Sequence, residues 1–140
     1  MQLLMFDLST LNLGAILVAT CSSFLLWGIW YSPWLFELAW LETSGLTPFD
    51  IKKADPLKVI GIAFIATFLI SMLFGFLVGT HPGVVFSTSL GFIVGLCWVS
   101  SVLAINYVFE QKPLKLFLIN AGYHTAQFTL IGLVFGLWPY

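Results

Sequence analysis

The sequence has 140 residues, of which 60% are hydrophobic and only 8% are charged, and its mean hydropathy is +1.04. A soluble domain usually carries about 25% charged residues, so five lysines and six acidic residues cannot cover a folded chain of this size with polar surface. The composition therefore excludes an ordinary soluble domain and indicates an integral membrane protein. The near balance of charges also excludes the basic surface that nucleic-acid binding requires.

Four long apolar segments predict the architecture. They lie at about residues 12–32, 57–79, 83–109 and 114–138. Each is long enough to cross about 30 Å of hydrocarbon at about 1.5 Å per residue. Backbone groups in hydrocarbon must be paired within the segment, which requires helices. We predict an all-α integral membrane protein with four transmembrane helices that form a single domain over residues 1–140.

The ends and connections of these segments predict how they are arranged. No Lys or Arg precedes the first apolar segment, so we expect this segment to remain as a membrane span and not to be cleaved as a signal peptide. The dipeptide His81-Pro82 joins the second segment to the third, and residues 111–113 join the third to the fourth. Such short turns predict that neighbouring helices pack as antiparallel hairpins.

The first connection, residues 33–56, is the longest. Residues 34–42 are too short and too acidic to cross the membrane, and they predict a short helix that lies in the membrane interface. Gly45 is expected to end this helix. The tetrapeptide Thr47-Pro-Phe-Asp50 is typical of a new helix start, with Thr47 as the N-cap, Pro at the first position and Asp50 near the positive end of the dipole.

The lysines predict the orientation in the membrane. All basic residues fall in or beside the first and third connections, which lie on one side of a four-span protein. The positive-inside rule places that side in the cytoplasm and both termini outside it. The residues concerned are Lys52, Lys53, Lys58, Lys112 and Lys115.

Polar residues inside an apolar segment are costly unless they are paired, so they are the candidates for function. On the third segment two of them are one helical turn apart, and two serines lie nearer its centre. On the fourth segment three of them follow at spacings of four and three, which places them on one helix face. The candidate intramembrane polar site comprises Asn106, Glu110, Asn120, His124, Gln127, Ser100 and Ser101.

These residues have two interpretations that the sequence leaves open. His124 lies near the middle of the hydrocarbon, where an imidazole is expected to be neutral because desolvation disfavours the charged form. It is either a proton-relay or ligand-binding group, or an interior histidine bonded to a serine or asparagine of a neighbouring helix. Glu110 is either a buried gating carboxylate or an interfacial anion beside Lys112 and Lys115. Under either interpretation, exposure to lipid would leave Asn120, His124 and Gln127 unpaired. We therefore expect this face of the fourth segment to point at protein.

Three pairs of glycines at a spacing of four predict close helix packing, within one chain or between copies. The pairs are Gly75 with Gly79, Gly91 with Gly95, and Gly132 with Gly136. Four helices enclose little interior, so a homo-oligomer is expected.

The sequence contains no catalytic or cofactor signature. Cys21 and Cys97 are isolated within apolar segments, and two histidines and two cysteines offer no metal-ligand spacing. We therefore expect no cofactor and no metal, and the chain is not expected to be an enzyme. Two hypotheses remain: an oligomeric transport or channel-type protein for an unidentified solute or ion, and an accessory or structural protein whose polar residues only pack helices. Membrane lipids are the partners expected in both.

Several tracts together carry a resemblance to a known family. They are residues 30–33, 44–53, 106–110, 117–124 and 136–138. In this order they resemble the family catalogued as domain of unknown function 1761. The resemblance covers nearly the whole chain and implies a small, mostly bacterial four-span membrane protein, in agreement with a bacterial inner-membrane location. No activity or site residue is implied by it.

Overall fold

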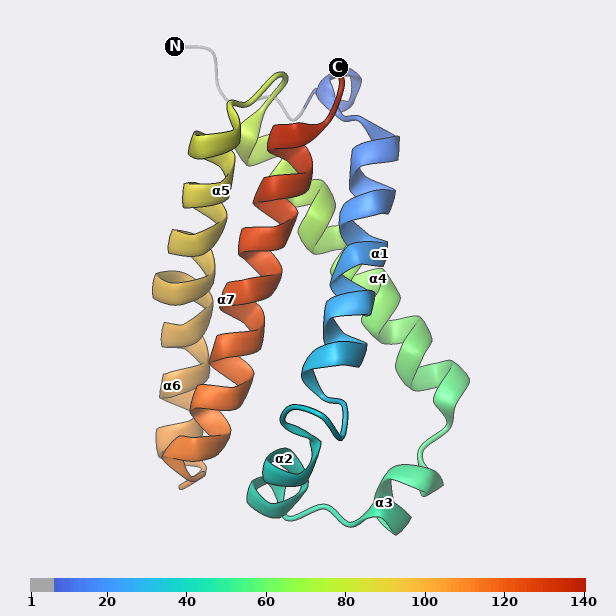
Figure 1. Ribbon diagram of the computed structural model, residues 1–140, viewed down its shortest axis with the longest axis vertical. Coiled ribbons are helices and arrows are strands. Elements are labelled where there is room, and N and C mark those ends of the chain that lie inside the picture. The colour runs from blue at the N-terminus through green and yellow to red at the C-terminus, as the bar shows by residue number, and fades with distance from the viewer. Residues whose placement is uncertain (1–6) are drawn as a thin grey trace.

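The computed structural model describes residues 7–140, and every regular element in that range is a helix, as expected for an all-α protein (Figure 1). The elements are η1 (Leu8–Thr10), α1 (Leu13–Trp30), α2 (Glu37–Ser44), α3 (Pro48–Lys53), α4 (Pro56–Val78), α5 (Val84–Ile93), η2 (Val94–Val99), α6 (Ser100–Phe109) and α7 (Leu114–Leu137). The long helices begin and end within about two residues of the four predicted segments.

Local sequence explains these boundaries. The Asn12 side chain accepts a hydrogen bond from the backbone N–H of Ala15 and caps α1. Thr47 and Asp50 form the predicted capping box at the start of α3, with Pro48 at the first helical position. Gly45 follows α2 in the left-handed conformation, with φ of 73°, which a residue without a Cβ adopts readily. The first connection therefore folds as two short helices.

The third long segment is one continuous helix of 26 residues, Val84–Phe109, with a π-helical section at η2. The Ser100 hydroxyl donates to the carbonyl of Gly95 at 2.8 Å, within this section. A π-helical turn inside an α-helix is uncommon and often marks a functional site. The apolar pattern of the sequence contains no signal for it.

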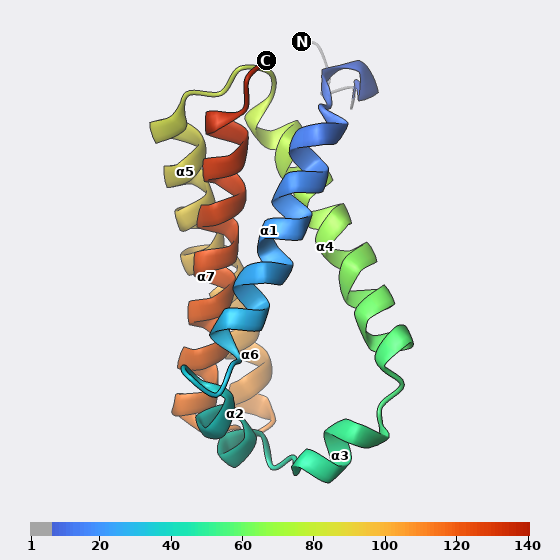
Figure 2. The same ribbon diagram turned by 45° about the vertical axis from the view of Figure 1, so that its right-hand side comes forward.

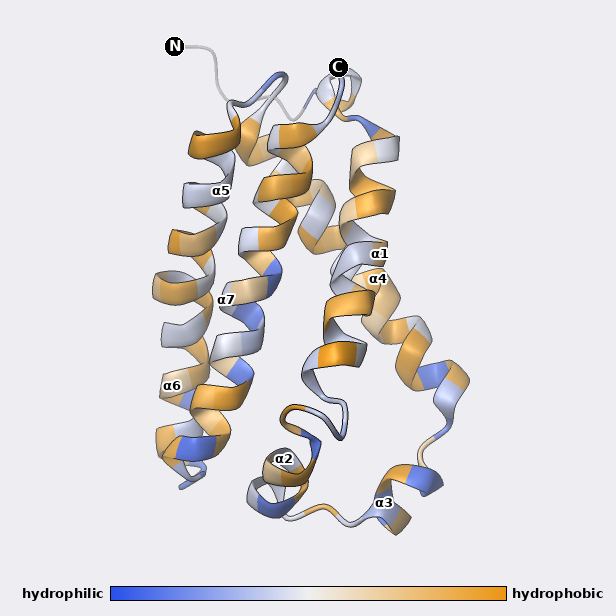
Figure 3. Ribbon diagram, in the orientation of Figure 1, coloured by the Kyte–Doolittle hydropathy of each residue, from blue (hydrophilic) through white to orange (hydrophobic). Residues whose placement is uncertain are grey.

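The prediction of four spans is supported in part. Within the described residues, three helices are long and apolar enough to cross a membrane by length and composition: α1, α4 and the continuous α5–η2–α6 helix. Although α7 has 24 residues, it carries polar residues in its first half, and Figure 3 shows these hydrophilic positions along its lower turns. The helix tolerates them because it is central, contacting α1, α2, α4, α5, η2 and α6. Nine residues of α7 are buried within the chain.

The packing of α5 against α7 depends on glycine. A Cβ built on Gly91 lies 2.1 Å from the Phe128 carbonyl oxygen, and one built on Gly132 lies 2.1 Å from the Ser87 carbonyl oxygen. Cβ atoms built on Gly95 and Gly136 lie 2.6 Å and 2.5 Å from atoms of the facing helix. The two backbones are therefore in direct contact along most of α5. Two of the three glycine pairs are thus used within one chain.

The hairpin prediction does not hold for the second and third segments. From their shared turn, α4 and α5 separate, with α7 packed against each of them, and α4 is paired mainly with α1 (Figures 1 and 2). The Thr20 hydroxyl contacts the Ser71 hydroxyl at 3.3 Å, and the Phe24 and Phe64 rings lie 5.8 Å apart between their centroids. Beyond that contact, toward α3, the first turns of α4 diverge from α1 (Figure 2). A short turn limits the distance between two helix ends, but side-chain packing sets the angle.

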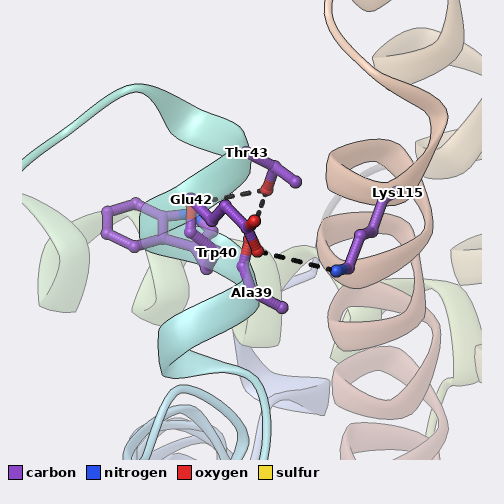
Figure 4. Close-up of polar contacts among 5 residues, drawn as sticks. All are labelled: Ala39, Trp40, Glu42, Thr43 and Lys115. Carbon is purple, nitrogen blue, oxygen red and sulfur yellow. Dashed lines mark hydrogen bonds and ion pairs between the residues drawn. The ribbon is translucent and has the colours of Figure 1, made fainter.

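The core lies where α1, α4 and α7 meet. Its buried side chains are Ala15, Ile16, Ala19, Phe74, Val78, Phe128, Ile131 and Phe135. At the opposite end of the molecule from the C-terminus, α2 lies against the start of α7 (Figure 4). There the Glu42 carboxylate is 3.9 Å from the Lys115 ammonium, and both side chains are exposed, so this pair contributes little to stability.

Candidate functional site

The polar row of α7 faces protein along its length. Gln127 is only 2% exposed, and Asn120 and His124 are half-buried. The spacing of four and three residues places all three on one side of α7. This arrangement avoids the cost of leaving amide and imidazole groups unpaired in lipid.

Asn120 connects two other helices through a pair of tyrosines. The Tyr31 hydroxyl, directly after α1, donates to Oδ1 of Asn120 at 2.6 Å. Nδ2 of Asn120 donates to the Tyr107 hydroxyl of α6 at 2.8 Å. One side-chain amide thus uses its acceptor toward α1 and a donor toward α6. We call these three residues the tyrosine bridge. It fixes the ends of α1 and α6 to the first half of α7.

Trp30 strengthens the same junction. Its indole N–H donates to the backbone carbonyl of Ile119 at 3.1 Å. A Cβ built on Gly122 would lie 3.1 Å from the Trp30 ring, so the indole lies flat against α7 at this glycine. Next to it, the Tyr31 ring packs against Tyr123 with centroids 5.5 Å apart and against Trp40 of α2 at 6.0 Å. The aromatic residues after α1 are therefore internal contacts, in addition to marking the membrane interface.

His124 is held by its own helix. Its Nδ1 is 2.9 Å from Oε1 of Gln127, three residues later on α7. Within residues 7–140, the printed partner of the imidazole is therefore on α7 and is not a serine or asparagine of a neighbouring helix. In the tautomer in which Nδ1 donates to this amide oxygen, Nε2 is an acceptor. Within residues 7–140, Nε2 makes no hydrogen bond. The site thus presents one basic nitrogen at mid-helix.

The remaining predicted residues are not brought to this row. Asn106 and Glu110 are exposed on α6, and neither bonds to α7 through its side chain. Ser100 is buried but donates to Gly95, and the Ser101 hydroxyl donates to the carbonyl of Cys97 on its own helix. Both serine hydroxyls therefore donate within their own helix and do not bond to His124.

A second group of polar side chains, unpredicted from the sequence, lies on α1 and α4. Thr20 and Ser23 of α1 and Ser71 of α4 are fully buried. The Tyr123 hydroxyl donates to the backbone carbonyl of Ser23 at 3.2 Å, and the Tyr123 ring lies 5.1 Å from the His124 ring. Together these groups form a buried polar layer between α1, α4 and α7.

The tyrosines were missed because aromatic residues near the ends of apolar segments are typical of a membrane belt. One signal was present for Tyr123: it is three residues from Asn120 and four from Gln127, close to the same helix face. No comparable signal exists for Tyr31 or Tyr107, because only folding brings them to Asn120.

The described residues contain no group of three or more His, Cys, Asp or Glu side chains that could hold a metal ion. Cys21 and Cys97 are both exposed. The chemistry available at the polar row is therefore hydrogen bonding by amide and hydroxyl groups and proton exchange at the His124 imidazole.

The chain matches the family model described as protein of unknown function (DUF1761) over residues 14–136. The chain belongs to this family. The match covers nearly all of the four long helices, together with the polar row and the tyrosine bridge. Neither a curated protein nor a solved structure matches the chain. The family carries no assigned activity, so function must be argued from the polar row itself.

Proposed function

We propose that this protein is a multi-pass membrane protein of the transport type, in which His124 passes a proton or binds a small hydrogen-bonding solute at mid-membrane. The observation that carries the proposal is the arrangement of the imidazole. Gln127 holds Nδ1 and thereby leaves Nε2 as an acceptor without a partner in the described chain. A titratable group at this depth is costly, and such groups in membrane helices generally serve transport or binding.

Two neighbouring features support this role. The built Cβ of Gly95, inside the π-helical section, lies 2.9 Å from the backbone carbonyl oxygen of His124, so the irregular turn and the imidazole lie at the same depth. The buried hydroxyl groups of Thr20, Ser23 and Ser71 lie in the polar layer that also contains Tyr123, whose ring packs on His124. Polar groups and irregular backbone at membrane depth are tolerated where they are enclosed by protein or line a pathway.

In this proposal α7 crosses the membrane inside the bundle, and α2 lies in the interface. The lysines of α3, of the first turn of α4, of the α6–α7 connection and of the first turn of α7 are all at one end of the molecule. By the positive-inside rule, this distribution supports a cytoplasmic location for that end, with both termini outside the cytoplasm. A bacterial inner membrane is the proposed location.

Association of copies is also part of the proposal, although two of the three glycine pairs do not support it. Gly91, Gly95, Gly132 and Gly136 are covered within the chain. Mass measurement in a lipid nanodisc tests this point, and a monomer there would remove the oligomer from the proposal.

The test of the transport role is a flux measurement in proteoliposomes. Under an imposed pH gradient and membrane potential, an entrapped pH-sensitive dye should report proton movement with the wild-type protein. His124→Ala should abolish it while leaving the unfolding transition in place. Ser101→Ala is the matched control, because its hydroxyl bonds only to its own helix and it should retain flux. If the wild-type protein moves neither protons nor a panel of small polar solutes, the transport role is wrong.

The tyrosine bridge favours a second candidate, an accessory or structural membrane protein. The bridge ties three helices together through Asn120, whose side-chain amide accepts from Tyr31 and donates to Tyr107. If polar residues serve packing alone, His124→Ala and Asn120→Ala should both lower the unfolding midpoint, and no flux should be measurable in either variant or in the wild type.

A further inference from the structure

Three lysines without ion-pair partners gather at the end where α3 meets α4. Lys52 and Lys53 are the last two residues of α3, and Lys58 lies in the first turn of α4. Within residues 7–140 the ion pair that forms is the one between Lys115 and Glu42, on the other side of the same molecular end. We define the α3 surface as residues 46–59, which comprise α3, its link to α4 and the first turn of α4.

The nearby carboxylates accept hydrogen bonds at the starts of α3 and α4. Asp50 accepts hydrogen bonds from the Thr47 N–H at 2.9 Å and from the Thr47 hydroxyl at 2.8 Å. Asp55 accepts from the N–H of Leu57 at 3.1 Å and caps α4. Both carboxylates are therefore fixed at helix starts and make no ion pair with the lysines.

The two sides of this molecular end differ in sign. The α3 surface carries three lysines and two aspartates, which leaves it positive. The opposite side, which comprises α2, the α6–α7 connection and the first turn of α7, carries three glutamates and two lysines, which leaves it negative. The residues of the opposite side are Glu37, Glu42, Glu110, Lys112 and Lys115. An anion is therefore expected to prefer the α3 surface.

Apolar side chains surround the lysines. Phe49 is 66% exposed and Leu57 is 84% exposed, and Leu46 and Ile51 are exposed as well. The Lys53 ammonium lies 4.4 Å from the centre of the Phe49 ring, so its aliphatic stem runs along an apolar surface. A short helix with exposed apolar side chains and lysines fits the boundary between lipid headgroups and acyl chains.

We propose that the α3 surface is a binding site for anionic phospholipids, with Lys52, Lys53 and Lys58 around the headgroup phosphate. The exposed Phe49 and Leu57 side chains contact the acyl chains below it. A lipid, in contrast to a free phosphate ion, satisfies both the ammonium groups and the apolar side chains. This site is independent of His124 and of any transport activity.

The test is lipid binding to the intact protein in detergent, followed by native mass spectrometry. Phosphatidylglycerol and phosphatidylcholine are titrated in parallel, and the wild-type protein should retain phosphatidylglycerol selectively. Each lysine near an anionic headgroup is worth about fivefold in affinity. The variant Lys52→Gln/Lys53→Gln/Lys58→Gln should therefore lose the selectivity, with helical content and unfolding midpoint unchanged because all three side chains are exposed.

Two controls make the result specific. Lys112→Gln/Lys115→Gln removes two lysines from the opposite side and should keep the selectivity. Inorganic phosphate added in excess should fail to displace phosphatidylglycerol, whereas displacement would show that the site takes phosphate alone. The proposal is overturned if the triple variant still prefers phosphatidylglycerol, if the opposite-side variant loses the preference equally, or if phosphate displaces the lipid.

Discussion

Replacement of Gly132 by alanine tests the contact between α5 and α7. The new Cβ would lie 2.1 Å from the Ser87 carbonyl oxygen, whereas real Cβ contacts essentially never fall under 3.0 Å. The obstructing atoms belong to backbone, so no side-chain rotation relieves the clash, and the helices must separate by about 0.9 Å locally. Separation also lengthens the bond that the Ser87 hydroxyl donates to the Gly132 carbonyl, now 2.8 Å.

The expected magnitude follows from two opposing effects. Overpacking of a tight interior typically costs about 1–3 kcal/mol, and a backbone obstruction places this site at the upper end. The better helix propensity of alanine offsets up to about 1 kcal/mol of this cost. Gly132→Ala should therefore lower the free energy of unfolding by about 2 kcal/mol. The matched control is Gly61→Ala in α4, where a Cβ meets nothing within 4 Å and only the propensity gain applies.

The assay is unfolding by a denaturing detergent in mixed micelles, followed by circular dichroism. Gly61→Ala should unfold at the same or a higher detergent fraction than the wild type, and Gly132→Ala at a clearly lower one. Equal stability of the two variants would refute the close α5–α7 contact.

Three further predictions concern the tyrosine bridge, the cap of α3 and the orientation in the membrane. Tyr31→Phe removes the hydroxyl that donates to Asn120, and it should lower the free energy of unfolding by about 1 kcal/mol in the same detergent assay; an unchanged midpoint would argue against the tyrosine bridge. The hydrogen bonds from Thr47 hold the pKa of Asp50 below its usual value of 3.8. The charged carboxylate therefore stabilises the start of α3 fully above that pH, and this stabilisation is lost as the pH falls through the lowered pKa. Amide exchange should then show α3 protected at neutral and mildly acidic pH and opening only in stronger acid, and opening already near pH 5 would contradict this cap. A reporter that is active only in the cytoplasm should be silent when fused after Tyr140, whereas activity would reverse the proposed orientation.

Much of the architecture follows from local sequence because its causes are local. Thr47, Pro48 and Asp50 form their capping box from residues three apart. Gly45 ends α2 because the left-handed conformation suits a residue without a Cβ. The lengths of the apolar segments predict the long helices because backbone pairing in hydrocarbon leaves few alternatives.

The candidate site was only partly predictable. The spacing of Asn120, His124 and Gln127 identifies one helix face, and that face points at protein in the structure. Spacing alone cannot identify partners on other helices, so Asn106 and Glu110 were included although they are exposed on α6. Polar type and depth made them candidates, whereas the rotation of α6 about its axis decides where they point.

By itself, the sequence determined the all-α membrane architecture, the ends of the helices and the lysines at one end, because these depend on composition and on neighbours within a few residues. Only the tertiary structure decided that α7 is central and that α4 separates from α5. It also decided that Tyr31 and Tyr107, 76 positions apart in the printed numbering, meet at one amide. In lipid the hydrophobic effect does not pull helices together, so their arrangement depends on close backbone packing and on a few interhelical hydrogen bonds. Those contacts join residues far apart in the chain, so patterns among neighbouring residues do not predict them.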